Sequence, residues 1–316
     1  MNESRLHWQA ESLWRQLLPL LPGLSVEVVA HADSTNTRLL ERARLSGGGR
    51  QERAYPRSLE AAAPAPAPGQ APTPLGRRAD DTQPCLLVAE HQTRGRGRLG
   101  RNWQSTPGAS LTFSLSLPYE PADWSGLSLS VGVALAEALD PLADGQAPRI
   151  ALKWPNDLWL VDPAVVGRKL GGVLIETVAV GRRRMAVIGV GLNLHPQPVR
   201  DPASGFASLD ELEPTLTPPD VLHRVALPLV EALRQHEREG FRPFVERYAQ
   251  RDLLLGRTVN TTAPAFEGTA RGVAEDGALL VETAQGLQRL SSGEVSVRLT
   301  GAAGAGAPWP AADGDA

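Results

Sequence analysis

The sequence predicts an α+β protein in which helices pack on a mixed, mainly antiparallel sheet and a small C-terminal β-barrel follows. Three observations lead to this class. Apolar runs of strand length adjoin one another as hairpins, and apolar or amphipathic runs of helix length occur between them without regular alternation. After Leu255, short β-rich pieces alternate with turns. The sequence contains no G-x-G-x-x-G or G-x-x-x-x-G-K-[ST] motif, which lowers the expectation of a doubly wound nucleotide fold.

The expected elements follow from hydrophobic periodicity. Helices are predicted at 6–18, 35–45, 127–139 and 221–239. Strands of the main sheet are predicted at 26–30, 86–89, 111–117, 150–154, 158–161, 173–180 and 185–194. In 111–117, leucine and phenylalanine alternate with serine and threonine, so this strand is expected to be half-buried. Ser34 is expected to cap the helix that begins at Thr35.

Composition sets the domain organisation. We expect a catalytic domain over 1–255, a small Src-homology-3-like barrel over 256–300 and a flexible tail over 301–316. Residues 46–82 are rich in proline and alanine and are expected to form a disordered surface insertion, although a proline-rich recognition motif is an alternative. Loop closure entropy grows slowly with length, so deleting this insertion is expected to leave activity intact.

Charge and cysteine content exclude several classes of protein. The 316 residues are 42% hydrophobic and 21% charged, with a net charge of -3, which argues against binding to nucleic acid through bulk charge. A single cysteine, Cys85, excludes an internal disulfide framework and a cysteine-built zinc site. No apolar run has membrane-spanning length and the N-terminus lacks a secretory pattern, so a cytoplasmic protein is expected.

The most unusual segment is the glycine-arginine stretch at 93–103, which reads TRGRGRLGRNW. Glycine lets a backbone wrap closely around a ligand, and arginine holds phosphate or carboxylate oxygens through its planar fork. A solvated basic loop and an RNA-binding arginine-glycine stretch are the alternatives. The segment lies between two predicted strands, whereas RNA-binding stretches of this kind are usually longer and repeated.

Three further motifs carry polar chemistry. KWPND at 153–157 is followed by RKLGG at 168–172, where Lys169 is expected at a strand start beside open backbone and could neutralise a developing negative charge. DSTN at 33–36 reads as a helix cap or as an anion site at a helix N-terminus. GVGLN at 189–193 places glycines within a strand, where a ligand or another backbone approaches closely. The KWPND segment alone could equally be a turn.

Together these motifs resemble biotin protein ligase, the bacterial enzyme that attaches biotin to a carrier lysine. The resemblance extends over about residues 25–300, and GEVSVR at 293–298 is similar to the closing strand of the family. It implies the biotin/lipoate ligase-like catalytic fold and an ATP-dependent ligase that forms biotinyl-5'-adenylate and releases pyrophosphate. The biotinyl group would then pass to a specific lysine of the biotin carboxyl carrier protein of acetyl-CoA carboxylase. ATP and Mg²⁺ are implied, and no protein metal ligand is assigned.

The resemblance also implies residue roles. The expected catalytic residues are Lys169, Arg96, Arg98 and Asp157. The expected biotin-binding residues are Ser34, Thr35, Asn36, Gln92, Gly95, Arg96, Gly97, Arg98, Lys169 and Gly172. The expected ATP- or adenylate-binding residues are Arg98, Arg101, Trp103, Asn156, Lys169 and Asn193. The C-terminal barrel, with Glu294 and Arg298, is expected to cover the nucleotide and assist the carrier.

Departures from the family pattern refine the expectation. The segment before the first motif is too short for a winged helix-turn-helix domain, so the monofunctional type, without operator binding or repressor function, is expected. Leu99 stands where the pattern often has arginine. Members of the family can pair through a sheet edge, and a homodimer is one state open to this chain. The rival functions are a lipoate or octanoate ligase or transferase, and an RNA-binding module.

Overall fold

A mixed sheet forms the centre of the fold in a computed structural model that describes residues 6–47, 82–143, 145–162, 165–198, 205–262, 264–291 and 297–299. Within these residues the sheet has seven strands, in the order β1 (Ser25–Ala32), β2 (Cys85–Gln92), β5 (Ser110–Pro118), β9 (Arg183–Asn193), β8 (Val165–Val180), β7 (Asp157–Asp162) and β6 (Ile150–Lys153). Strands β1 and β2 are parallel, and the other neighbouring pairs are antiparallel. The predicted mixed, mainly antiparallel sheet is confirmed.

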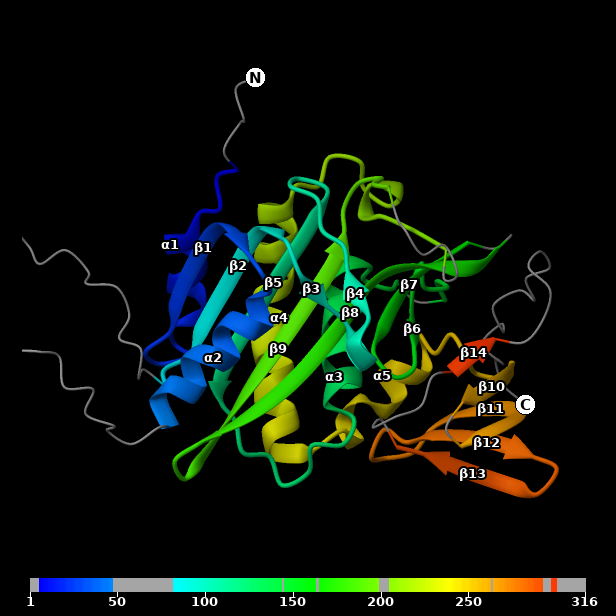
Figure 1. Cartoon of the computed structure of the whole chain (residues 1–316). Coiled ribbons are helices and arrows are strands. Elements are labelled where there is room, and N and C mark those ends of the chain that lie inside the picture. The colour runs from blue at the N-terminus through cyan, green and yellow to red at the C-terminus, as the bar shows by residue number, and fades with distance from the viewer. Residues whose placement is uncertain are drawn as a thin grey trace, which may run out of the picture.

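Helices cover both faces of this sheet (Figure 1). Helix α2 (Thr35–Gly47) lies on one face, and α1 (Ala10–Leu17), α3 (Leu127–Leu139) and α4 (Pro218–Glu239) lie on the other. Helix α3 is buried around most of its circumference because it is packed between the sheet and α4. A short helix, α5 (Val245–Ala249), follows α4. The first helix is shorter than predicted, because Gln9 has a left-handed backbone (φ 46°) and the helix begins after it.

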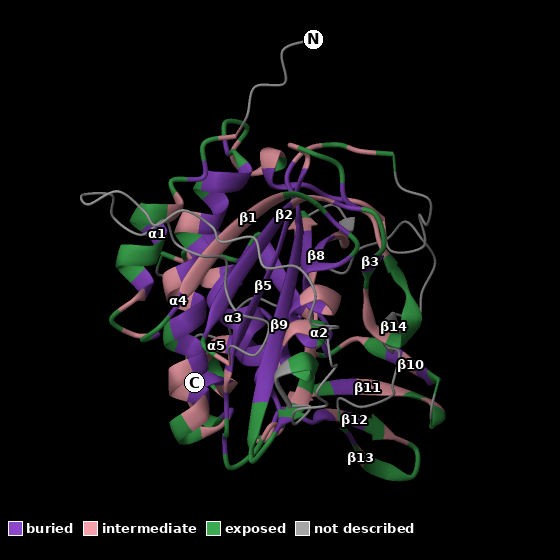
Figure 2. Ribbon diagram, turned by 60° about the vertical axis from the view of Figure 1, so that its left-hand side comes forward, coloured by how far each residue is buried: buried purple, intermediate pink, exposed green. Residues whose placement is uncertain are grey.

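Strand β5 corrects one prediction, since eight of its nine residues are buried and neither face is exposed to solvent (Figure 2). Its apolar side chains, such as Phe113, enter the main core. Its polar side chains face α2 and β2, where Thr112 donates to the Ala89 carbonyl and Ser114 bonds to side chains of α2. Hydrogen bonds within the protein satisfy these polar groups without water. The alternation of apolar and polar residues in β5 therefore marks two buried faces, one apolar and one hydrogen-bonded.

The C-terminal unit is a separate antiparallel sheet. Its described strands have the order β13 (Gly286–Leu290), β12 (Leu279–Thr283), β11 (Ala265–Val273), β10 (Thr258–Thr262) and β14 (Val297–Leu299). The predicted small β-unit is therefore confirmed, while its closure into a barrel stays a prediction because the described strands pair as an open series. Residues 48–81 of the predicted insertion and the tail 301–316 lie outside the described residues.

The two sheets meet beside the KWPND turn. The segment before the C-terminal sheet pairs with β6, since Leu152 donates its N–H to the Arg251 carbonyl and accepts from Leu253. The Trp154 indole N–H donates to the Gly277 carbonyl at the β11–β12 turn, at 3.0 Å. Both contacts fix the C-terminal sheet next to the residues of the KWPND motif. In the part of the chain that the structure describes, no helix is long and apolar enough to cross a membrane.

Candidate functional site

The first half of the site is a buried polar cluster where α2 begins over the sheet. Ser34, Thr35 and Asn36 each have only 3% of their surface exposed. The Gln92 Oε1 atom, at the end of β2, accepts from the Thr35 backbone N–H at 2.7 Å and lies 3.2 Å from the Thr35 hydroxyl. The Ser34 Oγ atom lies 3.4 Å from the Thr37 N–H, a long version of the predicted cap.

The hydrogen bonds within this cluster leave some donor and acceptor atoms available to a ligand. Ser114 Oγ lies 2.6 Å from both Thr35 Oγ1 and Asn36 Oδ1. Since an amide oxygen only accepts, Ser114 donates to Asn36, and its contact with Thr35 needs the Thr35 proton. The Gln92 Nε2 group has no hydrogen-bond partner among the described residues. The cluster therefore offers a free amide donor and fixed hydroxyl acceptors at one place.

The GVGLN motif lies directly beneath this cluster, on β9. A Cβ at Gly189 would lie 2.2 Å from Asn36 Oδ1, and one at Gly191 would lie 2.5 Å from the Trp103 ring. Real Cβ atoms do not approach so closely, so only glycine allows Asn36 and Trp103 to rest against the sheet. The sequence predicted that a ligand or another backbone would approach these glycines, and the structure places two side chains there instead. The Trp103 Nε1 group is buried and lacks a partner within the described residues, so it is a second donor available at this place.

The glycine-arginine stretch forms a small hairpin, β3 (Gly95–Arg96) with β4 (Asn102–Trp103), which sequence periodicity did not predict. It runs beside β8 on the side of the sheet that α2 covers (Figure 1). The Arg96 Nη2 atom donates to Glu176 Oε2 on β8 at 2.7 Å. The hairpin thus carries one arginine to the polar cluster, and its loop carries the next arginine to the second half of the site.

The second half of the site contains three charged groups and an amide. Arg98 Nη1 donates to Asn156 Oδ1 at 3.2 Å, and Lys169 Nζ donates to Asp157 Oδ1 at 2.7 Å. Burial lowers the pKa of the Arg98 guanidinium, against the effect of the Asp157 carboxylate, which raises it. Arginine remains charged at neutral pH even so. Asn156 also donates to the Val173 carbonyl at 2.7 Å, which holds the turn against β8.

Lys169 lies within β8, and the expectation of a strand start is wrong. Strand β8 begins at Val165 and continues through the RKLGG motif, with a register shift against β7 next to Lys169. A Cβ at Gly172 would lie 3.1 Å from Asp157 Oδ1 and 3.8 Å from Lys169 Cε, so this glycine keeps the space beside the ion pair open. Lys169 and Asp157 are about a quarter exposed, which leaves the ammonium accessible to an anionic ligand.

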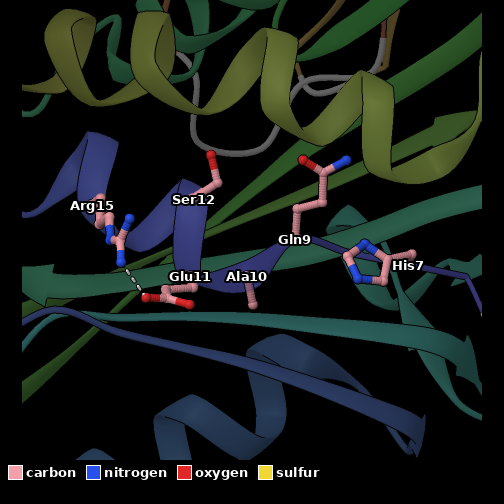
Figure 3. A pocket seen from close by; sticks show the side chains of 6 residues that line it. All are labelled: His7, Gln9, Ala10, Glu11, Ser12 and Arg15. Atoms are coloured by element: carbon pink, nitrogen blue, oxygen red, sulfur yellow. Dashed lines mark hydrogen bonds and ion pairs between the residues drawn. The ribbon is translucent and has the colours of Figure 1, made fainter.

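Two hollows occur near the described helices. One, of about 350 Å³, is lined by Arg98 and Asn156, by the start of α3 and by β8 side chains including Val173 and Ile175. The other, of about 440 Å³, lies beside the start of α1 and is lined by His7, Gln9, Ala10, Glu11, Ser12 and Arg15 (Figure 3). In the second hollow the only drawn interaction is an exposed Arg15–Glu11 pair at 2.5 Å, whereas the first adjoins the charged half of the site.

The remaining predicted residues lie around these two halves. Arg101 is exposed on the hairpin loop, where its carbonyl accepts from the Gly97 N–H at 2.7 Å. Asn193 is buried, and its Nδ2 group lies 3.1 Å from the Ala207 carbonyl and 3.4 Å from the Lys169 carbonyl. It therefore ties the end of β9 to the segment beside Lys169. Glu294 lies outside the described residues, and Arg298 is opposite Asn260 in the β10–β14 pair.

Sequence reasoning missed three residues of the polar cluster. Ser114 was expected on a solvent face, and Ser105, whose Oγ accepts from the Gln92 N–H at 2.8 Å, lay outside every motif. Glu176 contacts both Asn36 and Arg96. The serine and threonine alternation at 111–117 was the available signal for Ser114. Nothing in the sequence near Glu176 indicates a partner 80 or 140 positions earlier.

The arrangement places a buried hydrogen-bonding cluster, with the Glu176–Arg96 ion pair at its edge, beside the charged half of the site on the same sheet. The first can hold a polar ring that needs both donors and acceptors. The second presents an ammonium and a guanidinium to anionic oxygens, with a carboxylate between them. The site can therefore hold a ligand that forms hydrogen bonds at one end and carries negative charge at the other.

Comparisons with known proteins match this fold and site to one class. The Biotin/lipoate A/B protein ligase family matches residues 78–193, and the Biotin protein ligase C terminal domain matches residues 254–298. The chain belongs to the biotin protein ligase family.

Individual members of this family are similar to the chain in sequence and in structure. The Biotin--[acetyl-CoA-carboxylase] ligase of Paracoccus denitrificans is 31% identical over 66% of this chain and 88% of its own length. The Bifunctional ligase/repressor BirA of Salmonella typhimurium is 37% identical over 67% of this chain, which spans just under two thirds, 66%, of that relative. The solved Biotin protein ligase from Aquifex aeolicus in complex with biotin and ATP is 27% identical, with a TM-score of 0.62, over 88% of this chain and 100% of that one.

Proposed function

We propose that this protein is an ATP-dependent ligase that converts biotin to biotinyl-5'-adenylate and transfers the biotinyl group to a lysine of a biotin carboxyl carrier protein. The observation that carries the proposal is the glycine-arginine hairpin, which joins the neutral cluster at Asn36 to the charged cluster at Lys169. Family membership and the Aquifex aeolicus complex with biotin and ATP support the same activity.

The neutral cluster supports binding of the ureido ring of biotin. That ring has one carbonyl acceptor and two N–H donors, and the cluster has the free Gln92 amide donor together with hydroxyl and amide oxygens of Ser34, Thr35 and Asn36. Gly189 and Gly191 let Asn36 and Trp103 rest against the sheet, and Gly172 leaves space beside the Lys169–Asp157 pair. Gly95, Gly97 and the two hairpin arginines would enclose the ligand.

The charged cluster supports the chemistry of activation. A biotin carboxylate oxygen attacks the α-phosphorus of ATP, and the bond from that phosphorus to pyrophosphate breaks. Lys169 and Arg98 would stabilise the negative charge that accumulates when a carboxylate meets a triphosphate. In the second step the carrier lysine amine attacks the acyl carbon, AMP leaves, and Asp157, which accepts from Lys169 in the free protein, would accept the proton that the amine loses.

The nucleotide and its metal would occupy the same half of the site. Arg98, Arg101, Trp103, Asn156, Lys169 and Asn193 are the proposed adenylate-binding residues. Within the described residues, no group of three or more His, Cys, Asp or Glu side chains could hold a metal ion. Mg²⁺ commonly binds through substrate phosphates and one or two carboxylates, so we propose that it arrives with ATP and that Asp157 is the available protein oxygen.

The wider organisation is part of the proposal. The catalytic domain would comprise residues 1–255 and the small C-terminal domain residues 256–300, with Glu294 and Arg298 covering the nucleotide.

The partner would be the carrier protein of acetyl-CoA carboxylase in the cytoplasm. A homodimer through a sheet edge is tested by sedimentation at several protein concentrations.

Biotin-dependent exchange of labelled pyrophosphate into ATP tests the proposed activity. Purified protein with Mg²⁺ is expected to catalyse exchange with biotin and to give only background with lipoate or octanoate. Exchange with lipoate or octanoate alone would instead support the rival acyl ligases. Folded protein that exchanges with none of these acids would contradict the proposal, and salt-dependent RNA binding would then be measured.

A further inference from the structure

Glu176 lies at the junction of three elements of the site. One of its carboxylate oxygens, Oε2, accepts from Asn36 Nδ2 on α2 at 2.9 Å and from Arg96 Nη2 on the hairpin at 2.7 Å. The Glu176 side chain is 26% exposed, so it is partly withdrawn from solvent. A single oxygen atom therefore connects the start of α2 and the glycine-arginine hairpin to β8.

The contact fixes the orientation of the Asn36 amide. Its two N–H groups point to the Leu174 carbonyl, at 3.1 Å, and to Glu176. Its oxygen accepts from Ser114, and an amide oxygen has two lone pairs. With Glu176 present, Asn36 can offer a ligand only the remaining lone pair of Oδ1. It therefore acts as an acceptor for a ligand N–H, and the flipped amide would turn its oxygen toward the Leu174 carbonyl and the Glu176 carboxylate and lose both of those bonds.

The same carboxylate fixes the Arg96 guanidinium. Arg96 uses one of its five N–H donors on Glu176, and no other hydrogen bond of its side chain occurs within the described residues. The remaining donors are free to bind an anionic or carbonyl oxygen of a ligand. Without the carboxylate, the Arg96 side chain, which is 41% exposed, would have to be ordered by the ligand itself.

We propose that Glu176 is a positioning residue for biotin, which holds Asn36 as a hydrogen-bond acceptor and Arg96 over the pocket before the ligand arrives. This inference rests on the proposed function and deepens it, because it assigns biotin recognition to a residue outside the glycine-arginine, KWPND and GVGLN motifs. Glu176 contacts the ligand only through its two partners, so its removal affects biotin binding and leaves the ATP half of the site intact.

The test compares two variants and a matched control. Glu176→Gln keeps an oxygen that accepts from Asn36 but removes the charge that faces Arg96, whereas Glu176→Ala removes both. Glu41→Gln on the exposed side of α2 changes the net charge equally and is the control. Biotin affinity is measured by calorimetry without ATP, and KM for biotin, KM for ATP and kcat are measured by pyrophosphate exchange.

We expect Glu176→Gln to weaken biotin binding about tenfold and Glu176→Ala further, with KM for ATP within about twofold of the wild type. In an Arg96→Gln background, Glu176→Gln should cost less than twofold, since the charge partner has already gone. Glu41→Gln should match the wild type. Because Glu176→Gln is isosteric, it remains informative even where Glu176→Ala fails to fold.

Two results would overturn the inference. One is unchanged biotin affinity in Glu176→Gln, and the other is an equal rise in KM for biotin and ATP, which indicates a general structural role. Wild-type protein that shows neither biotin binding nor exchange would overturn the proposed function. The wild-type measurement therefore separates the failure of the proposed function from the failure of the positioning role alone.

Discussion

At the residue scale, the Lys169–Asp157 pair is the most consequential contact of the charged half. Lys169 and Lys153 are the only lysines of the chain, and they lie in different surroundings. Lys169 Nζ bonds to Asp157 at 2.7 Å, whereas Lys153 Nζ lies 4.5 Å from the centre of the Trp159 ring. The two lysines therefore form a matched pair for testing the effect of a charge inside the site.

Lys169→Ala is expected to slow adenylate formation by roughly 2–4 kcal/mol of barrier, because a preorganised charge at the reacting oxygens is lost. Lys169→Arg should recover part of the rate by keeping the charge. Single-turnover formation of biotinyl-adenylate is the measurement, with Lys153→Ala as the control of smaller effect. A Lys169→Ala enzyme at the wild-type rate would remove this residue from the proposed mechanism.

A second residue, Asp252, makes stability depend on pH. Its carboxyl group is fully buried, and burial raises its pKa to about 7. The Oδ2 atom has no partner within the described residues. An unfolded aspartate has a pKa of about 3.9, so between that value and about pH 7 the folded chain holds a proton that the unfolded chain releases. This contribution to stability is present at low pH and is lost as pH rises through the folded pKa.

Asp252→Asn removes this titration and supplies a neutral side chain of the same shape. Relative to that variant, the wild-type free energy of unfolding should fall by about 2–4 kcal/mol between pH 4 and pH 8. Urea unfolding of both proteins across this range measures the difference. A constant difference across the range would show that the carboxyl group has an ordinary pKa.

At the scale of elements, the β3–β4 hairpin depends on close approach at one glycine. A Cβ at Gly95 would lie 2.4 Å from the Trp103 carbonyl oxygen, its partner in the hairpin register, whereas the nearest atom to a Cβ at Gly97 would be 3.5 Å away. Gly95→Ala must therefore separate the two strands, and Gly97→Ala fits without movement. The two substitutions add the same methyl group two positions apart.

We expect Gly95→Ala to raise KM for biotin at least tenfold and to release adenylate that the hairpin would otherwise retain. Gly97→Ala should have a clearly smaller effect on both. Biotin titrations of pyrophosphate exchange, together with trapping of released adenylate by hydroxylamine, measure these effects. Equal losses in the two variants would indicate that the hairpin register is not what holds the ligand.

Some helices and strands could be predicted from the sequence and others could not. Helix α3 and the hairpin of β8 and β9 were predictable because their apolar periodicity is local. The exposure of β5 was not, since alternation of Ser114 with Phe113 looks the same for a solvated face and for a face buried against polar groups of α2. The motifs indicated Asn36, Arg96 and Lys169, but Glu176 became visible only when distant segments met in the fold.

At the scale of the whole molecule, the β11–β12 turn of the C-terminal sheet contacts the KWPND segment. Gly277 has a φ of 79°, and a Cβ there would lie 2.7 Å from Gly126 Cα at the start of α3. Its carbonyl accepts from the buried Trp154 indole, two residues before Asn156. The C-terminal sheet therefore helps to hold in place the turn that carries Asn156 and Asp157.

Gly286 provides the control for this contact. It has a φ of 103° at the first position of β13 in the same sheet, and no atom lies within 4 Å of a Cβ built there. Alanine at either glycine incurs a left-handed backbone cost of about 1–2 kcal/mol. Only alanine at Gly277 also collides with α3, so the difference between the two variants isolates docking of the sheet.

Gly277→Ala should lower the rate of adenylate formation and expose the segment between α5 and β10 to trypsin, whereas Gly286→Ala should lower thermal stability alone. The reason is that the Trp154–Gly277 bond cannot persist when the turn moves away from Gly126, and the KWPND turn loses that support. Pyrophosphate exchange and timed proteolysis at a temperature well below both melting points measure the two effects. If the variants behaved alike in both assays, the C-terminal sheet would not position the KWPND turn, and any role of this sheet in catalysis would have to come from other contacts, such as those proposed for Glu294 and Arg298.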